Sequence, residues 1–208
     1  MSPTLAVVVA VAAGYLLGSF DFAVWVGRSR GVDIYEVGSG NPGTSNVART
    51  LGKGAAAIVL VGDLMKGLIA AAVGFVVQPE PVDGLLAGFG LAALAGLAAV
   101  VGHCYPVLHR FKGGKGVATA FGVLLFLEPR IGVALGVAWA LLVVVTRTAS
   151  IGSLGVLLAT WPAFWWFGPS RAASLWVGAI VVLVVARHAP NIGRILRRSE
   201  STIDRDET

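Results

Sequence analysis

The feature that most constrains this chain is a series of long apolar runs separated by short polar stretches. A helix needs about 20 mostly apolar residues to cross the hydrocarbon layer of a membrane. On that criterion the sequence predicts seven membrane-spanning helices, at residues 5–27, 55–77, 84–102, 116–127, 131–146, 151–167 and 172–186. The fourth run is short, so an arrangement with five spans, in which neighbouring runs merge, is an alternative.

The composition excludes a water-soluble globular domain. Of the 208 residues, 56% are apolar and 13% are charged, and the mean hydropathy is +0.82, whereas soluble domains carry about a quarter charged residues. The single cysteine, Cys104, excludes an internal disulfide. We therefore predict an all-α integral membrane protein, with one polytopic domain at residues 1–198 and a polar tail at residues 199–208.

The charges of the connecting segments predict how the bundle lies in the membrane, because Lys and Arg are retained on the cytoplasmic side. Only Arg130 and Arg171 fall on one side of a seven-span bundle, and Lys66 lies inside a span. The other 13 of the 16 Lys and Arg residues share the opposite side, in segments 28–54, 103–115, 147–150 and 187–208. This bias predicts an amino terminus outside and a carboxyl terminus in the cytoplasm.

The segment from Val37 to Arg49, which we call the first inner segment, has three glycines, one proline and two asparagines within ten residues. This composition predicts irregular backbone rather than a regular helix. Such backbone can direct several N–H groups at one anion, and an arginine can clamp a phosphate with two hydrogen bonds. A plain turn between two spans is the alternative. The candidate ligands are Ser39, Gly40, Asn41, Gly43, Asn46 and Arg49.

A glycine-rich run with two lysines, residues 112–116, precedes the fourth apolar run, and we call it the glycine loop. Glycines let the backbone approach an anion, N–H groups at the helix start face it, and lysines add charge. The spacing differs from that of the Walker loop. The alternative is that the lysines only fix the topology and that His103 is a structural hydrogen-bonding residue. The candidates are His103, Lys112, Gly113, Gly114, Lys115 and Gly116.

Two charged residues in the second predicted span, Asp63 and Lys66, are three positions apart and so share a helix face. A charge in the membrane interior costs a few kcal/mol unless it is paired. Mutual neutralisation is one explanation of the pair, and the other is that Lys66 reaches an anion in a polar cavity. Asp21, near the inner end of the first span, has no evident local partner.

The segment after the seventh run places His188 and Asn191 among several arginines. Arginines at this position can reach anionic lipid head groups, but that explanation does not extend to His188 and Asn191. Ser150, beside Arg147 at the turn after the fifth run, completes the inner polar set. No Cys/His spacing typical of zinc and no carboxylate cluster typical of a divalent ion occurs, so we expect no metal and no cofactor.

At these residues the sequence resembles the PlsY-type acyl-phosphate:glycerol-3-phosphate acyltransferases of bacteria. The resemblance extends over nearly the whole chain and departs from the family pattern at Ser19-Phe20-Asp21, where Ser-Ile-Pro is frequent, and at Thr148, where an aromatic residue is frequent. The matching segments are residues 38–49, 63–67, 102–106, 111–119 and 188–194, together with Glu200.

The resemblance implies a seven-helix bundle in the bacterial inner membrane with its active site facing the cytoplasm. It also implies transfer of an acyl group from acyl phosphate to the 1-hydroxyl of glycerol 3-phosphate. The products are lysophosphatidate (1-acylglycerol 3-phosphate) and phosphate, in the first step of phospholipid synthesis. The implied partners are glycerol 3-phosphate, acyl phosphate, membrane lipid and the enzyme that produces acyl phosphate; no nucleic acid is expected.

On this basis we predict that Ser39, Arg49, Lys115 and His188 are catalytic. The sequence does not assign either substrate phosphate to either loop, and the proton acceptor is a substrate phosphate oxygen or His188. The predicted substrate-binding residues are Gly40, Asn41, Gly43, Asn46, Lys66, His103, Lys112, Gly113, Gly114, Gly116, Ser150 and Asn191.

Two other classes of protein fit the sequence less well. A phosphate transporter lines a path with basic residues near the membrane midplane, but the polar motifs here lie on one side and no inverted repeat is visible. A CDP-alcohol phosphotransferase holds its metal with several aspartates, whereas the only aspartates in the predicted spans are Asp21 and Asp63.

Overall fold

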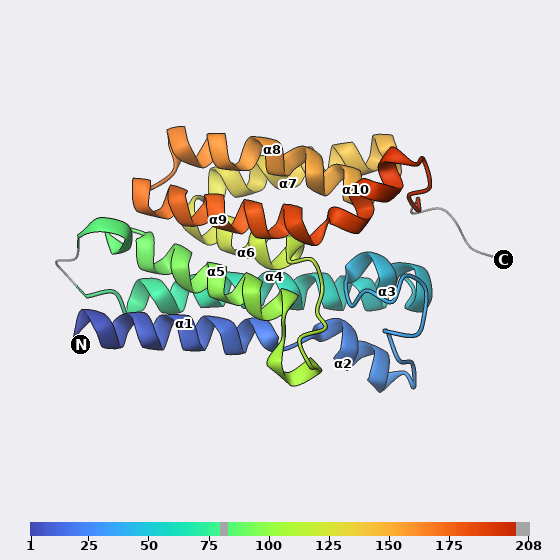
Figure 1. Ribbon diagram of the computed structural model, residues 1–208, viewed down its shortest axis with the longest axis horizontal. Helices are drawn as coiled ribbons and strands as arrows, with labels where there is room; N and C mark the ends of the chain where they lie inside the picture. The colour runs from blue at the N-terminus through green and yellow to red at the C-terminus, as the bar shows by residue number, and fades with distance from the viewer. Residues whose placement is uncertain (80–82, 203–208) are drawn as a thin grey trace.

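The computed structural model describes residues 1–79 and 83–202, and all regular structure within these ranges is helical (Figure 1). The two short 3₁₀ helices are η1 (Gly84–Leu86) and η2 (Val107–His109). The α-helices are α1 (Pro3–Ser19), α2 (Phe22–Ser29), α3 (Thr44–Leu51), α4 (Lys53–Val76), α5 (Gly90–Cys104), α6 (Val117–Leu127), α7 (Pro129–Thr146), α8 (Ala149–Phe167), α9 (Arg171–Arg187) and α10 (Ala189–Leu196).

All seven predicted apolar runs contain helix, which confirms the all-α prediction, but their lengths differ. Five helical stretches within the described ranges are long and apolar enough to cross a membrane, counting α1 with α2 and α5 with η2 as one stretch each. Helices α9 and α10, which meet at 54°, make a bent sixth. Helix α6 has only 11 residues, which is about 17 Å of helix against a hydrocarbon layer of about 30 Å. The number of spans therefore depends on how α6 is counted.

The first predicted span, residues 5–27, is a broken helix rather than a continuous one. Helix α1 ends at Ser19 and α2 begins at Phe22. Asp21 caps the new helix, because its carboxylate accepts hydrogen bonds from the N–H groups of Ala23 and Val24 at 3.0 and 3.1 Å. An Asp at this position offers the backbone an alternative to the helical hydrogen bond, and it explains the break.

The first inner segment also differs from its prediction. A helix, α3, begins at Thr44 and includes Asn46 and Arg49, although the composition predicted irregular backbone up to Arg49. The glycines and the proline all lie at or before Gly43, which is the extended N-cap of α3. The residues that follow are compatible with a helix, and the burial of Val47 holds its inner face against the bundle.

The helices approach one another through small side chains, as membrane helices do. A Cβ atom on Gly18 of α1 would lie 2.0 Å from the carbonyl oxygen of Ala99 in α5, and one on Gly122 of α6 would lie 1.9 Å from that of Leu64 in α4. Large apolar side chains instead face outward, with Val145 and Leu158 at least 80% exposed. Small residues between the helices and large apolar side chains on the outer surface suit a protein that lipid surrounds.

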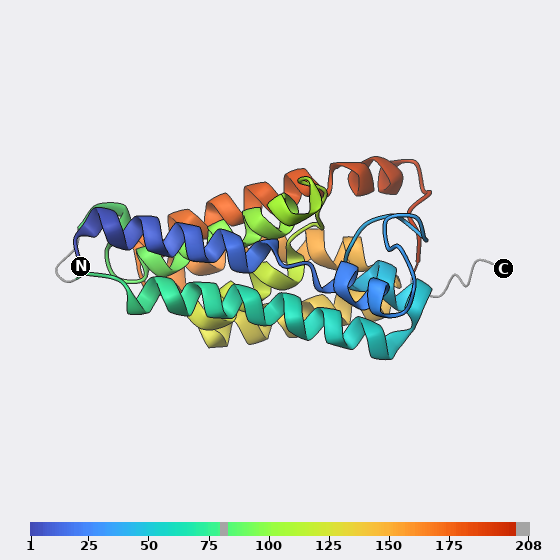
Figure 2. The same cartoon turned by 90° about the horizontal axis from the view of Figure 1, so that it is seen from below.

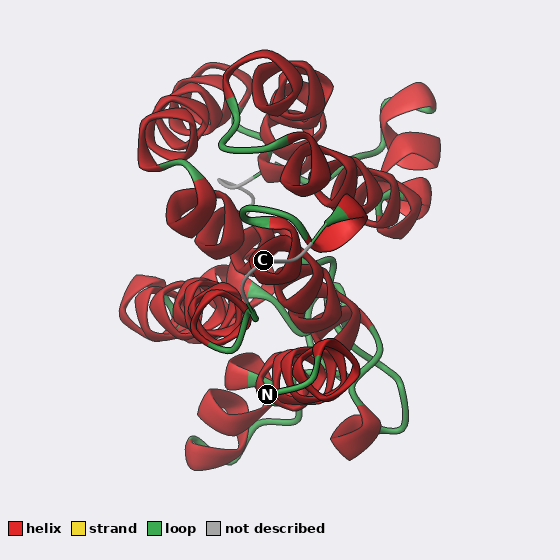
Figure 3. Cartoon of the chain, turned by 90° about the vertical axis from the view of Figure 1, so that its left-hand side faces the viewer, coloured by secondary structure: helices red, strands yellow, loops and turns green. Residues whose placement is uncertain are grey.

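Helices α1, α4 and α5 pack together on one side of the bundle, and α7, α8 and α9 pack on the other, with α6 between them (Figure 1). Figure 3 looks along the bundle from the end that holds the amino terminus and shows the helix axes running in a common direction. The N-terminus and η1 lie at one end, whereas α2, α3 and α10 lie at the other (Figures 1 and 2). The predicted polar segments thus gather at one end.

We expect cysteines introduced at Ser45 and Lys112 to react with a membrane-impermeant thiol reagent from one side of the membrane, and a cysteine at Asp83 from the other. All three positions are exposed, and Cys104 is fully buried and serves as an unreactive background. The measurement is labelling of vesicles of both orientations. Labelling of positions 45 and 112 from opposite sides would contradict a single polar end.

Candidate functional site

Side-chain bonds tie the first inner segment, the glycine loop and the end of α9 together. The hydroxyl of Tyr35, just before the first inner segment, donates to the carbonyl of Lys112 at 2.7 Å. The guanidinium of Arg187 donates to the carbonyls of Gly114 at 3.0 Å and Gly113 at 2.8 Å. Segments far apart in sequence therefore form one site at the polar end of the bundle.

Asn46 fixes the shape of the first inner segment. Its Nδ2 donates to the carbonyls of Ile34 and Val37 at 3.3 and 3.1 Å, and its Oδ1 accepts the backbone N–H of Ser39 at 2.8 Å. Asn46 is 2% exposed, and these bonds occupy both ends of its amide. The geometry gives Asn46 the role of holding the loop, while the Ser39 side chain on that loop is exposed.

The glycine loop fits closely under the end of α5. The N–H of Gly114 donates to the carbonyl of His103 at 3.1 Å. A Cβ on Gly113 would lie 2.1 Å from that carbonyl oxygen, so a larger residue there needs a backbone shift. Gly116, with φ of +86°, is the N-cap of α6 and makes no side-chain cap bond. The first N–H groups of α6 are thus free of a side-chain cap, as an anion site at a helix start requires.

Arg187 is a residue whose role the sequence did not predict. Its bonds to Gly113 and Gly114 hold the two carbonyls toward α9, and its guanidinium lies over the Tyr105 ring at 5.0 Å. Charge-assisted bonds of this kind satisfy backbone groups that have no helical partner. The sequence offered only an arginine among other arginines, so nothing in it separated Arg187 from those that reach lipid.

Lys115 lies among other charged groups from three segments. Burial lowers the pKa of Lys115 from its ordinary value of 10.5 to about 8. The carboxylate of Glu200 opposes this shift, and Arg194, Arg49 and Arg187 add to it through charge repulsion. Arg49 and Lys115, which are both predicted to be catalytic, therefore repel each other electrostatically. A cluster of cations that lacks enough counter-charge is what an anionic ligand completes.

Glu200 joins the tail to the helical body, although the sequence assigned it to a polar tail beginning at residue 199. Its carboxylate accepts from Ser150 of α8 at 2.8 Å, from Arg194 of α10 at 2.7 Å and from Asn191. Burial raises the pKa of Glu200, but the bonds from Arg194, Asn191 and Ser150 outweigh burial, so the net shift is downward. Ser150 and Asn191 thus position Glu200, and the Asn191 Oδ1 is left without a partner.

His188 is 1% exposed and lies at the bend between α9 and α10. Its Nδ1 lies 2.7 Å from the carbonyl oxygen of Val184. A carbonyl only accepts, so Nδ1 carries the proton and the Nε2 of the neutral ring has a free lone pair. His188 can therefore accept a proton at Nε2.

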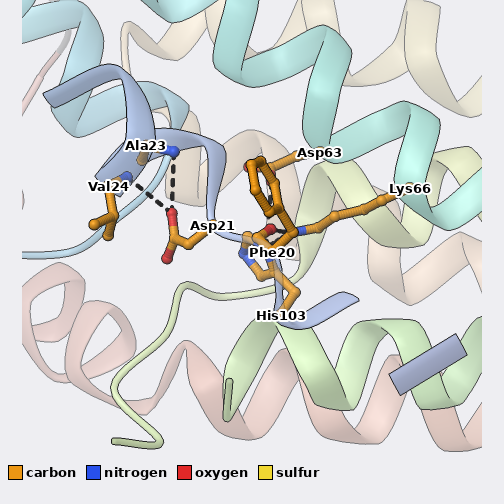
Figure 4. A network of polar contacts seen from close by, with 7 residues as sticks. All are labelled: Phe20, Asp21, Ala23, Val24, Asp63, Lys66 and His103. Carbon is orange, nitrogen blue, oxygen red and sulfur yellow. Dashed lines mark hydrogen bonds and ion pairs between the residues drawn. The ribbon is translucent and has the colours of Figure 1, made fainter. Parts of the chain in front are cut away.

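Asp63, Lys66 and His103 form a buried polar cluster beside the break in the first span (Figure 4). The Lys66 ammonium lies 2.8 Å from the Asp63 carboxylate, 2.9 Å from the carbonyl of Phe20 and 2.8 Å from Nδ1 of His103. This cluster adjoins the glycine loop, because the backbone carbonyl of His103 accepts the N–H of Gly114. Among residues 1–79 and 83–202, no three His, Cys, Asp or Glu side chains form a group that could hold a metal.

The bundle and its polar end define a multi-pass helical membrane protein whose cationic residues gather at one end. Over residues 8–198 the sequence matches the family described as Glycerol-3-phosphate acyltransferase. The chain belongs to this family, which confirms the predicted PlsY-type resemblance. It is thus an acyltransferase of lipid synthesis.

Relatives and solved structures agree with this assignment. A glycerol-3-phosphate acyltransferase of Neisseria meningitidis is 43% identical over 195 residues, covering 93% of this chain and 96% of the relative. One from Rubrobacter xylanophilus is 40% identical, with 93% of each chain covered. The crystal structure of PlsY (YgiH), an integral membrane glycerol 3-phosphate acyltransferase, is 34% identical in its glycerol 3-phosphate form, with a TM-score of 0.85 and 94% of each chain covered. Its lysophosphatidic acid form is 33% identical with a TM-score of 0.84, again covering 94% of each chain.

The close fit of the glycine loop predicts that Gly114→Ala lowers the thermal unfolding midpoint of the purified protein. The added Cβ would lie 2.3 Å from Nε2 of His103 and 2.7 Å from the carbonyl oxygen of Pro42, and overpacking of this kind costs about 1–3 kcal/mol. Gly54→Ala is the matched control, because no heavy atom lies within 4 Å of its Cβ and Ala favours a helix. Equal midpoints for the two variants would contradict the close fit.

Proposed function

We propose that the protein transfers an acyl group from acyl phosphate to the 1-hydroxyl of glycerol 3-phosphate, giving lysophosphatidate and phosphate. The observation that carries the proposal is the meeting of two polar loops and the end of α9 at one cationic site, through the Tyr35–Lys112 and Arg187–glycine-loop bonds. Two phosphate-bearing substrates need such a site. The forms in which PlsY has been solved, with glycerol 3-phosphate and with lysophosphatidic acid, support the same acceptor and product here.

The proposed orientation places the amino terminus outside and the cationic end in the cytoplasm of a bacterium, across its inner membrane. Support comes from the 13 of 16 Lys and Arg residues on that side of a seven-span arrangement and from the rule that such residues are retained inside. In this arrangement α6 is the seventh span, and the glycine loop directly precedes it in the chain. Arg187 satisfies the carbonyls of Gly113 and Gly114, which have no helical partner where the loop meets this short helix.

The two substrates divide the site between them in this proposal. Ser39, Gly40, Asn41, Gly43 and Arg49 bind one phosphate. The glycine loop binds the other with Lys112, Lys115 and the N–H groups that follow Gly116. Asn46, Ser150 and Asn191 act by holding these parts in place, because their side chains bond to the protein itself.

The transfer itself proceeds directly between the substrates. The acceptor hydroxyl oxygen forms a bond to the carbonyl carbon, the bond from that carbon to the phosphate oxygen breaks, and phosphate leaves. The hydroxyl proton goes to Nε2 of His188 or to a substrate phosphate oxygen. Positioning and charge stabilisation are sufficient catalysis for an acyl donor that already has a good leaving group, so no metal, cofactor or acyl-enzyme is required. The fully buried Cys104 is not available as a nucleophile. The enzyme that makes acyl phosphate is the implied partner.

The test is an assay of purified protein with acyl phosphate and glycerol 3-phosphate, in which we expect lysophosphatidate and one equivalent of phosphate. EDTA should leave the rate unchanged. Enzyme mixed with radiolabelled acyl phosphate alone and then denatured should carry no stoichiometric label that hydroxylamine releases. Such a label would refute direct transfer, loss of activity in EDTA that a divalent ion restores would refute the metal-free step, and absence of product would refute the function.

We expect kcat/KM to fall as the pH rises through about 8, because the Lys115 ammonium, whose pKa is about 8, loses the charge that binds phosphate. Lys115→Arg, which stays charged, should lack this alkaline limb, whereas Lys53→Arg, at an exposed position that is not among the predicted site residues, should retain it. Between pH 8 and 10.5 the unfolded chain binds more protons at this residue than the folded one, so this shift makes the fold more stable as the pH rises. Loss of stability linked to Lys115 is therefore not the cause of the fall in kcat/KM. An alkaline limb that survives in Lys115→Arg would contradict the assignment.

A further inference from the structure

The Lys66 ammonium has three close polar partners. The Asp63 carboxylate forms an ion pair with it at 2.8 Å, and the carbonyl of Phe20 at 2.9 Å and Nδ1 of His103 at 2.8 Å are its hydrogen-bond partners (Figure 4). Lysine has no further donor, and its side chain is 4% exposed. All three partners of the buried ammonium belong to the protein itself. Lys66 therefore acts through its neighbours, although the sequence predicted it as a substrate-binding residue.

The contact with Lys66 determines which nitrogen of His103 carries the proton. An ammonium cannot accept a hydrogen bond, so Nδ1 of His103 must accept the bond and carry a lone pair. The Asp63 carboxylate, at 3.5 Å from the same Nδ1, is too distant to reverse this assignment. In the neutral ring the proton is then on Nε2.

The Nε2–H of His103 lies where the two polar loops meet. A Cβ on Gly114 would be 2.3 Å from Nε2 and 2.7 Å from the carbonyl oxygen of Pro42, so Nε2 and Pro42 occupy the same side of Gly114. Within the part of the chain that the structure describes, no acceptor forms a hydrogen bond with Nε2. A ligand oxygen at this junction would accept a hydrogen bond from the Nε2–H group.

We propose that the buried Asp63–Lys66 pair locks His103 in its Nε2–H form, and that this N–H donates to a phosphate oxygen held between the first inner segment and the glycine loop. This proposal rests on the proposed function, since it names a further contact to a substrate phosphate. His103 is the catalytic-site donor, and Asp63 and Lys66 are positioning residues.

A locked neutral donor has an advantage over another cation at this site. Lys115 already experiences repulsion from Arg49, Arg187 and Arg194, and a protonated imidazole would add to that repulsion. A neutral His103 in the other tautomer would turn a lone pair toward the anion and repel it. The fixed tautomer therefore supplies a hydrogen bond without further charge.

The lock can be tested without any activity measurement, by nitrogen NMR of protein labelled at its three histidines, with His103 assigned from the loss of its signals in His103→Asn. We expect a single Nε2–H tautomer in the wild type and a shift of the Nε2 signal on addition of glycerol 3-phosphate. To avoid an unpaired buried charge, Lys66 is varied together with Asp63→Asn. Asp63→Asn/Lys66→Gln retains an N–H for Nδ1 and should keep the tautomer, whereas Asp63→Asn/Lys66→Met should lose it. Thr160→Val, a buried hydroxyl lost from α8, is the control and should leave the histidine signals unchanged.

The activity measurements then separate the donor from its supports. His103→Asn should lower kcat/KM roughly tenfold to a hundredfold, as loss of a hydrogen bond to a charged group does. His103→Gln, which returns an amide N–H near the Nε2 position, should recover part of that loss. Adding His103→Asn to the Asp63→Asn/Lys66→Met variant should lower kcat/KM little further, because the residues act as one unit.

Three results would overturn the proposal. The first is an Nδ1–H tautomer in the wild type, and the second is an Nε2–H tautomer that persists in Asp63→Asn/Lys66→Met. The third is an additive loss of kcat/KM when His103→Asn is added to that variant. A failure of the proposed function is distinct from these. In that case the wild type makes no lysophosphatidate, while the tautomer experiment, repeated with inorganic phosphate, still reports on the lock.

Discussion

A charge inside a helical membrane protein needs a partner for each of its hydrogen-bonding groups, and the Lys66 ammonium obtains its partners from three segments. The break between α1 and α2 exposes the carbonyl of Phe20, α4 provides Asp63, and α5 provides His103. These bonds hold three helices in register next to the glycine loop. This buried contact adjoins the polar end of the bundle, where an apolar cluster that includes Ile34 and Val47 anchors the first inner segment.

The glycine loop shows the same constraint on the backbone. It lies between the end of α5 and the short helix α6, so its carbonyls have no helical partner. Arg187 bonds to two of them, and the carbonyl of His103 receives the N–H of Gly114. Glycine is required where a Cβ would meet that carbonyl at 2.1 Å. The N–H groups at the start of α6 receive no side-chain cap, and these are the groups that we assign to phosphate binding.

Much of the fold and part of the site could be predicted from the sequence. Long apolar runs required helices, and turn residues such as Glu128-Pro129 marked the helix limits to within a few residues. The break at Phe20–Asp21 was not predicted, because a single Asp in an apolar run does not reveal that its carboxylate will cap a new helix. Helix α3 was missed because the glycines that precede Thr44 dominated the composition of its segment.

The sequence by itself determined the membrane environment, the class of secondary structure and the polar segments that we assign to phosphate binding, since these follow from local composition and spacing. Tertiary structure alone decided what each polar residue does. Lys66 and Asn46 have side chains suited to binding an anion, yet both are consumed by backbone and neighbouring groups. Arg187, which composition could not separate from other arginines, holds the glycine loop. The physical reason is that a hydrogen bond occupies one donor, and only the folded arrangement determines which acceptor is nearest.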